Sequence, residues 1–189
     1  MHESGLRGRG VRLPKWQPAF PPGTLERIYL HWTAGDYHTV YPAYHYCIAL
    51  DDEGESIVCA TRDLRSNMRE VRDGGPLYAA HVAGRNSFAA GVAVAGMLGA
   101  TPQAFGEYPL RDDMLEALCR VARALADAFA IPVDAAHVAT HAEAAVEDGY
   151  FGAGADERWD IARLRPEPSP LEALEAVRAG DRLRARIRA

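Results

Sequence analysis

Two histidines and one aspartate, far apart in the sequence, have the chemistry to bind a metal ion. His31 lies in YLHWTAG, His141 ends HVATH, and Asp160 lies in ERWDI. Catalytic zinc commonly takes three nitrogen or oxygen ligands from the protein and leaves the fourth position to water. Two neutral imidazoles and a carboxylate supply that set. Structural interpretations stay open, because His31 fits an edge-strand aromatic residue and Asp160 fits a helix cap.

The strands that position these residues follow from the hydrophobic pattern. We predict strands over residues 27–32 and 137–141, each of which carries one of the histidines near its end. Residues 44–50 and 56–61 flank the acidic turn DDEG and have the pattern of a β-hairpin. The apolar run 91–98 is too short for a helix and does not alternate, which predicts a central strand buried on both faces.

Two helices are predicted after these strands. Apolar residues between 111 and 130 recur at helical spacing, and Pro132 prevents continuation. The capping box SPLE, at 169–172, predicts a terminal helix that begins near Pro170. The order strand, hairpin, strand, long helix, strand, helix predicts an α/β fold, a single domain with a central mixed β-sheet flanked by helices.

Three regions are expected along the chain. Residues 1–24 are rich in proline and glycine and predict an N-terminal arm without regular structure. Residues 25–165 form the catalytic domain, and residues 166–189 form a C-terminal helical tail. The tail ends in the arginine-rich DRLRARIRA, which is either a solvated helix face or a weak contact for an anionic surface.

Composition excludes several classes of protein. The 189 residues are 48% hydrophobic and 25% charged, with a formal charge of −5, which is typical of a globular protein and argues against a nucleic-acid partner. No apolar run approaches the length of a membrane span, and no Sec-type signal is recognisable, so we expect accumulation in the cytoplasm as a monomer. Cys47, Cys59 and Cys119 are expected to be free thiols.

Five segments carry a family resemblance that covers about residues 27–164. They are LHWTAG at 30–35, YHYCIALDDEG at 44–54, AAHVAGRNSFAAGVAVAG at 79–96, THAEA at 140–144 and RWDI at 158–161. In this order they resemble the zinc-dependent N-acetylmuramoyl-L-alanine amidases. That family includes phage endolysins, anhydromuramyl-peptide recycling amidases and the peptidoglycan recognition proteins, and the resemblance implies their fold.

The resemblance assigns roles to individual residues. It implies that zinc is held by His31, His141 and Asp160, that Tyr44 and Arg158 stabilise a developing oxyanion, and that His81 and Asn86 line the substrate cleft. Tyr44 also fits a packed strand tyrosine with a satisfied hydroxyl. Arg158 stands where lysine is common in the family, and a guanidinium stabilises charge without shuttling protons.

The general base is the least determined part of the site. Recycling amidases carry a glutamate in the strand that matches GVAVAG, where this chain has Ala93 and Ala95. Glu143, two residues after His141, is the candidate base. It equally fits a partner for the ring N–H of a ligand histidine or a cap for the following turn.

The resemblance implies hydrolysis of the amide between N-acetylmuramic acid and L-Ala in peptidoglycan. The expected role is that of a phage or prophage endolysin that waits in the cytoplasm for release by a holin. Two alternatives are a cytoplasmic enzyme that recycles anhydromuropeptides and a peptidoglycan-binding module without catalysis. The presence of all three ligand residues favours an enzyme.

Overall fold

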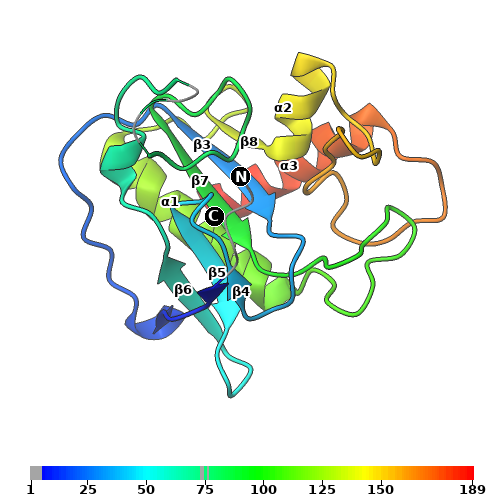
Figure 1. Cartoon of the computed structure of the whole chain (residues 1–189), viewed down its shortest axis with the longest axis horizontal. Helices are drawn as coiled ribbons and strands as arrows, with labels where there is room; N and C mark the ends of the chain where they lie inside the picture. The colour runs from blue at the N-terminus through cyan, green and yellow to red at the C-terminus, as the bar shows by residue number, and fades with distance from the viewer. Residues whose placement is uncertain (1–5, 73–74, 76) are drawn as a thin grey trace.

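The computed structural model describes residues 6–72, 75 and 77–189 (Figure 1). The elements are, in chain order, β1 (Leu6–Arg7), β2 (Val11–Arg12), the 3-10 helix η1 (Leu13–Lys15), β3 (Arg27–Trp32), β4 (Thr39–Val40), β5 (Tyr46–Leu50), β6 (Ser56–Ala60), the 3-10 helix η2 (Leu64–Ser66), β7 (Ala89–Val94), α1 (Asp112–Phe129), β8 (Val138–Thr140), α2 (His141–Asp148) and α3 (Ala173–Arg188).

A mixed sheet with the strand order β2-β6-β5-β7-β3-β8 forms the centre of the single domain. The β5–β6 hairpin is antiparallel, whereas β5–β7, β7–β3 and β3–β8 are parallel pairs. Every residue of β7 is buried, as expected for a central strand. The predicted fold class is therefore confirmed. β3 has the bounds that were predicted for the strand over residues 27–32.

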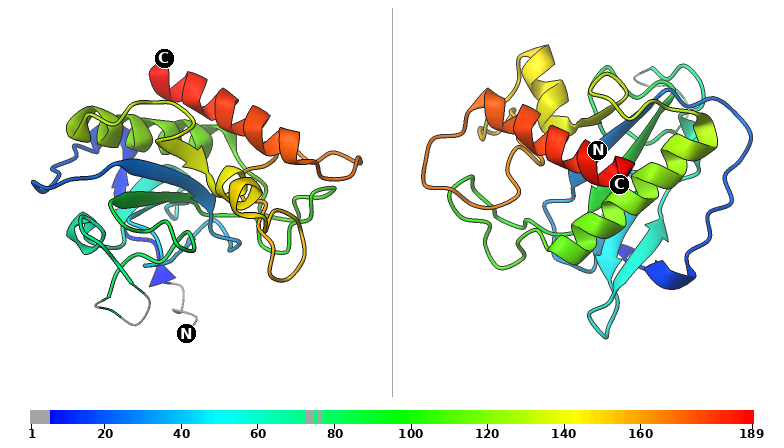
Figure 2. Two further views of the ribbon diagram at one scale, coloured as in Figure 1. Left: turned by 90° about the horizontal axis from the view of Figure 1, so that it is seen from above. Right: turned by 180° about the vertical axis from the view of Figure 1, so that it is seen from behind.

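Helices α1 and α3 cover one face of this sheet, and α2 lies at its end beside β8 (Figure 2). The long helix is confirmed: acidic residues occupy its first turn, its apolar side chains are buried, and Ala130 ends it in a left-handed conformation. Leu183 and Ile187 of α3 are buried in the same core as α1. The C-terminal helix is thus an integral part of the core packing.

The N-terminal segment contains regular structure that the sequence did not predict. β1 pairs with β4, and β2 adds an antiparallel edge strand to β6. Glycine permits this approach, because a Cβ at Gly10 would lie 2.4 Å from the carbonyl oxygen of Val58. The prediction of an arm without regular structure is wrong for residues 6–15 and is confirmed for residues 16–24, whereas residues 1–5 lie outside the described residues.

The terminal helix begins at Ala173 and not near Pro170. Its capping box consists of Glu172 and Glu175. Ser169 does not cap the helix, because its carbonyl and hydroxyl oxygens accept hydrogen bonds from the Arg163 guanidinium, each at 3.1 Å.

Two further features concern the cysteines and the membrane. Cys47 and Cys59 are opposite each other on β5 and β6, and all three cysteines are free and buried. Among the described residues, no helix has both the length and the apolar character needed to span a membrane.

Candidate metal centre

The ends of two neighbouring parallel strands bring the two histidines together. Leu30 on β3 is in register with Thr140 on β8, so the next residues, His31 and His141, lie at the same edge of the sheet. His31 is the fifth residue of β3, and His141 begins α2. Their ring centroids are 4.8 Å apart.

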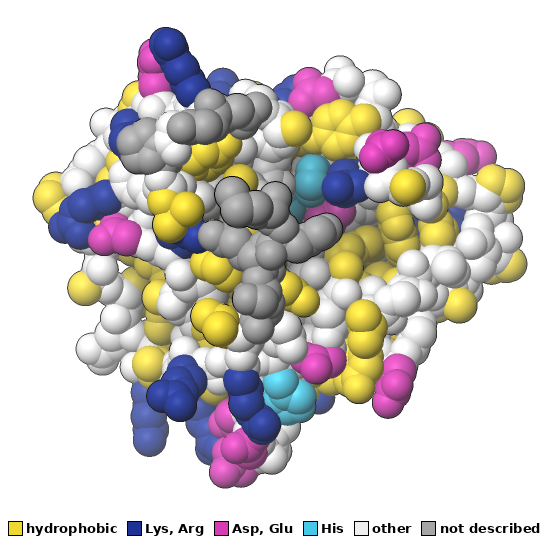
Figure 3. All heavy atoms as spheres, viewed as in Figure 1, with side chains coloured by type: hydrophobic (Ala, Val, Ile, Leu, Met, Phe, Trp, Pro, Cys, Tyr) yellow, Lys and Arg dark blue, Asp and Glu magenta, His cyan; other side chains and the backbone are white. Residues whose placement is uncertain are grey.

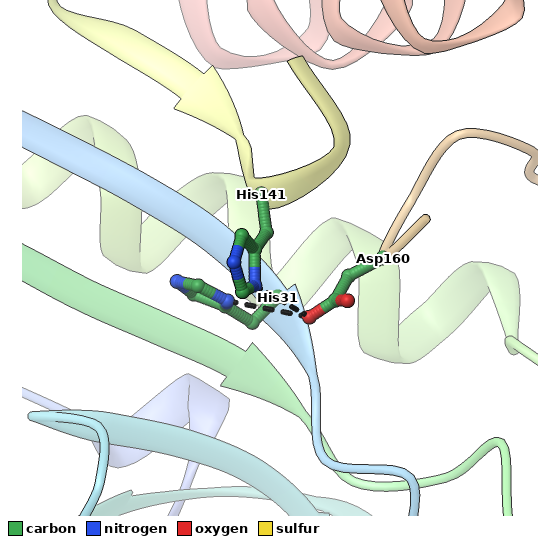
Figure 4. A group of neighbouring side chains, drawn as sticks. All are labelled: His31, His141 and Asp160. Carbon is green, nitrogen blue, oxygen red and sulfur yellow. Dashed lines mark hydrogen bonds and ion pairs between the residues drawn. The ribbon is translucent and has the colours of Figure 1, made fainter. Parts of the chain in front are cut away.

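Asp160 reaches this edge from the loop that follows α2. The loop is fastened to α2 by a hydrogen bond from the Ala142 N–H to the carbonyl oxygen of Asp160, at 3.1 Å. The Asp160 Oδ2 atom lies 3.4 Å from Nδ1 of His31 and 3.1 Å from Nδ1 of His141 (Figure 4). The three donor atoms all lie within 4.8 Å of one another, a spacing that one metal ion can bridge.

The electrostatics of the cluster suit a metal ligand set. His31 is fully buried, and this burial lowers its pKa to about 4, against a hydrogen bond to Asp160 that raises it. Burial alone would raise the pKa of Asp160, but the charge and hydrogen bond of His141, with those of His31, hold it below its usual range. At neutral pH the cluster therefore offers a neutral imidazole and an ionised carboxylate.

Tyr44 and Arg158 lie at the border of the cluster. The Tyr44 ring is 5.0 Å from that of His31, and its hydroxyl donates to the Trp32 carbonyl at 3.1 Å. Burial raises the pKa of Tyr44 well above its usual value, so the hydroxyl stays protonated. Arg158 is exposed, and its guanidinium donates to the carbonyl oxygens of its own loop. Its charge is near enough to act on Tyr44, in the direction that lowers the pKa.

His81 and Asn86 lie in the loop that precedes β7. The Asn86 side-chain oxygen accepts the backbone N–H groups of His81 and Val82, both at 3.0 Å, and so fixes the turn. The His81 ring is buried 5.3 Å from the ring of His31. Both residues are buried, and they pack beside the cluster. Their role in lining a substrate cleft stays a prediction.

Glu143 makes contacts that favour the capping interpretation over the role of general base. Its carboxylate accepts the Thr140 N–H at 2.8 Å, and the Thr140 hydroxyl accepts the Glu143 N–H, which together form a capping box. Both carboxylate oxygens also bind Arg184 of α3, at 2.8 and 3.0 Å. The carboxylate is thus directed towards α3, close to Gly180, where an added Cβ would clash with it.

Two features of the site were missed in the sequence. Helix α2 was not predicted, although Thr140-x-x-Glu143 is a capping box of the kind that indicates a helix start. Arg184 was taken as part of a solvated or surface-binding tail, yet its side chain is 3% exposed. No sequence pattern links it to Glu143, which lies 41 positions away.

The face that carries the site is hollowed. Figure 3 shows a depression beside α2 in which histidine, basic and acidic side chains lie together. The arrangement can bind a divalent cation through three protein groups and leave room for further ligands from solvent.

Comparison with known proteins identifies the family. Residues 21–159 match the family described as N-acetylmuramoyl-L-alanine amidase, and this match covers well over half of the chain. The chain therefore belongs to the N-acetylmuramoyl-L-alanine amidase family. The matched region includes His31 and His141 and ends one residue before Asp160.

Other comparisons add little to the assignment. A search of curated proteins gave no match. Among solved structures, the chain is similar to the N-acetylmuramyl-L-alanine amidase AmiD from E. coli, in a complex with anhydro-N-acetylmuramic acid-L-Ala-D-gamma-Glu-L-Lys. The identity is 18%, the TM-score is 0.41, and the match covers 68% of this chain and 52% of that chain, which is about half its length.

Proposed function

We propose that this protein is a zinc-dependent amidase that hydrolyses the amide bond between N-acetylmuramic acid and L-Ala in peptidoglycan. The observation that carries the proposal is the convergence of His31, His141 and Asp160 in a chain of this family. A binding module without catalysis would not need three converging metal ligands. The ligand set therefore favours the enzyme over the module.

The donor groups of the cluster fit zinc. Both histidines direct Nδ1 towards Asp160, and the set of two nitrogens and one oxygen is one that catalytic zinc sites use. A zinc ion held by these groups would lower the pKa of a coordinated water and polarise the substrate carbonyl. Zinc is not unique in accepting imidazole and carboxylate ligands, so metal analysis is part of the test.

The protein's own groups would orient the substrate and stabilise charge. Tyr44 keeps its proton and lies beside His31, so its hydroxyl can exchange the Trp32 carbonyl for a developing oxyanion. Arg158 can release the loop carbonyls that it binds and contribute positive charge at the rim. A proton acceptor other than Glu143 is required, because the Glu143 carboxylate is bound by Arg184.

The product of the reaction tests the proposal. Purified muropeptides incubated with the metal-loaded protein should yield free stem peptides and intact glycan, which mass analysis would identify. Cleavage within the glycan or within the stem peptide would contradict the proposal, and so would intact substrate.

Within this activity, we propose the role of an endolysin. The proposal is supported by the depression on the surface that holds the site (Figure 3). A polymeric wall can reach such a face. Intact sacculi and soluble anhydromuropeptides separate this role from recycling. Release of peptides from intact sacculi is the expected result, and activity restricted to the soluble substrate would reject the endolysin.

A further inference from the structure

The loop that carries Asp160 to the metal cluster is built around a buried arginine. Residues 149–172 connect α2 to α3, and Arg163 follows Asp160 by three positions. The Arg163 side chain is 2% exposed. A buried guanidinium is costly unless its N–H groups are paired, so its partners show what the loop must hold in place. The family match ends at residue 159, so Arg163 and α3 both lie outside it.

Each nitrogen of the Arg163 guanidinium donates hydrogen bonds. Nε and one terminal nitrogen bind the two carboxylate oxygens of Glu175, the second of them at 2.7 Å. The terminal nitrogens also bind the Ser169 hydroxyl at 3.1 Å and backbone carbonyl oxygens at 2.8–3.1 Å, which belong to Pro102, Glu167, Ser169 and Pro170. The five N–H groups of the side chain are therefore all used within the protein.

These hydrogen bonds join three segments that are separate in the sequence. Pro102 lies in the loop between β7 and α1, residues 167–170 lead into α3, and Glu175 lies in the first turn of α3. The Glu167 N–H also donates to the Pro102 carbonyl at 3.2 Å, so the two loops lie side by side (Figure 1). One side chain thus fixes the Asp160 loop against α3 and against the loop that follows the central strand.

The backbone between Asp160 and Arg163 is strained. Ile161 has a φ of +61° and is fully buried. A β-branched residue rarely adopts this left-handed conformation, which persists only where the surrounding structure holds it. The next residue, Ala162, is buried in a cluster with Ala142 of α2 and Ala176 of α3. The strained turn therefore takes the chain from the metal cluster directly into the space between the two helices.

The other side of Asp160 is held by packing. The Trp159 ring lies 4.4 Å from the Trp32 ring, edge to face, and 6.1 Å from the Phe105 ring. Asp160 thus lies between an aromatic contact on one side and the bonds of Arg163 on the other. Its carboxylate can point at His31 and His141 only while both sides keep the backbone in this path.

We propose that Arg163 is a positioning residue that holds residues 160–163 in the strained conformation that directs the Asp160 carboxylate at the two imidazoles. This inference rests on the proposed metal centre. A ligand that the fold places in advance binds a metal more tightly than one that the metal must order. Lysine could not replace Arg163, because an ammonium offers three donors from one point and not a planar fork.

Zinc affinity tests the proposal without reference to catalysis. The full chain, stripped of metal, would be titrated with zinc in competition with a chromophoric chelator. Arg163→Lys keeps the positive charge beside Glu175, and Arg163→Met removes every donor. We expect zinc affinity to fall about 10- to 100-fold in both variants, because the backbone at Ile161 would relax and carry the Asp160 carboxylate away. A folded Arg163→Met protein with wild-type zinc affinity would overturn the proposal.

A matched control separates positioning from loss of stability. Leu183→Ala removes a fully buried side chain of α3 and should lower stability, but Leu183 is not among the hydrogen-bond partners of Arg163. Zinc affinity should keep its wild-type value at a temperature where thermal unfolding shows this variant to be folded. A fall in zinc affinity equal to that of Arg163→Met would overturn the proposal.

A double variant tests whether Arg163 acts through Asp160. In an Asp160→Asn background, Arg163→Met should lower zinc affinity no further, because the ligand that Arg163 positions is already lost. A second loss of the same size as in the wild-type background would overturn the proposal. This readout does not change with the overall stability of the fold.

Hydrogen exchange covers the case in which the Arg163 variants do not fold. In zinc-free wild-type protein, the Ala162 N–H, which donates to the Trp159 carbonyl at 2.8 Å, and the Glu167 N–H should exchange as slowly as the amides of α3. Protection that appears only after zinc is added would overturn the proposal. Failure of the wild type to bind zinc would overturn the metal centre itself, whereas tight zinc binding without amide hydrolysis would reject only the amidase.

Discussion

The first turn of α2 contributes to two buried polar clusters, one through Glu143 and the other through His141. The two clusters differ in how fully their polar groups are paired. Glu143 is matched by Arg184 and by the Thr140 N–H, so its carboxylate is satisfied within the protein. His141 instead joins His31 and Asp160, whose donor atoms converge, while Nε2 of His31 has no partner among the described residues. The first cluster fastens α3 to the sheet, and the second is prepared for a ligand.

A structural polar cluster and a ligand-binding one can look alike in composition. Both clusters are buried and both contain a carboxylate, so neither burial nor residue type separates them. The difference is whether an external ligand is needed to satisfy the lone pairs.

Removing a ligand of the metal cluster should have the largest effect on function and little effect on folding. His31→Ala and Asp160→Asn should each lower metal affinity and amidase activity together by at least about 100-fold, since a bound metal supplies several kcal/mol to such reactions. Metal content by elemental analysis and peptide release would be measured on the same samples. Retained lysis in either variant would refute the assignment.

Breaking the Glu143–Arg184 pair should give the opposite result. Glu143→Ala leaves a guanidinium that is 3% exposed without its buried partner, and we expect a loss of about 3–5 kcal/mol in the free energy of unfolding. Zinc affinity should be retained at a temperature where the variant is folded. Denaturant unfolding and the chelator assay would measure the two quantities.

A control for this pair is Asp181→Ala, since Asp181 is the exposed partner of Arg184. We expect a loss below about 1 kcal/mol. The interpretation would be wrong if Glu143→Ala kept its stability and zinc but lost kcat. That result would restore Glu143 as the general base.

The buried His45 should make folding stability depend on pH. Burial lowers the pKa of His45 to about 4 in the folded protein, from 6.5 when exposed, and Arg62 and Asp63 act on it in opposite directions. The unfolded chain binds the extra proton between these values, so stability is complete above pH 6.5 and falls as the pH decreases towards 4. The contribution is about 3 kcal/mol.

His45→Asn removes this titration and keeps an acceptor oxygen near the position of Nδ1 for the Gly91 N–H. Urea unfolding of both proteins at a series of pH values would show a smaller pH dependence in the variant. Identical slopes in the two proteins would contradict the prediction.

A small effect is expected from the cap of α2. The Thr140 hydroxyl accepts the Glu143 N–H at 3.1 Å, and Thr140→Ala should cost about 1 kcal/mol of unfolding free energy. Thr140→Ser keeps the hydroxyl and should restore most of it. A calorimetric comparison would check this, and equal stability of the alanine variant would show that the cap is dispensable.

Local sequence patterns predicted much of the fold. The run 27–32, the hairpin, the buried strand and the helix between 111 and 130 were recognisable because each carries its own hydrophobic period and turn residues. The predictions failed where a residue distant in the sequence determined the local structure. Ser169 lost its capping role to Arg163, and Gly10 admitted an edge strand against β6.

The sequence by itself determined the donor types of the candidate metal cluster, the strand that carries His31 and the strand that ends just before His141. The family resemblance implied that Asp160 belongs with them. Only the tertiary structure decided how close its carboxylate lies to the two imidazoles, that Glu143 turns to Arg184, and that His81 lies beside His31. The physical reason is that strand and helix periods are local, whereas the pairing of buried polar groups depends on which segments the folded core brings into contact.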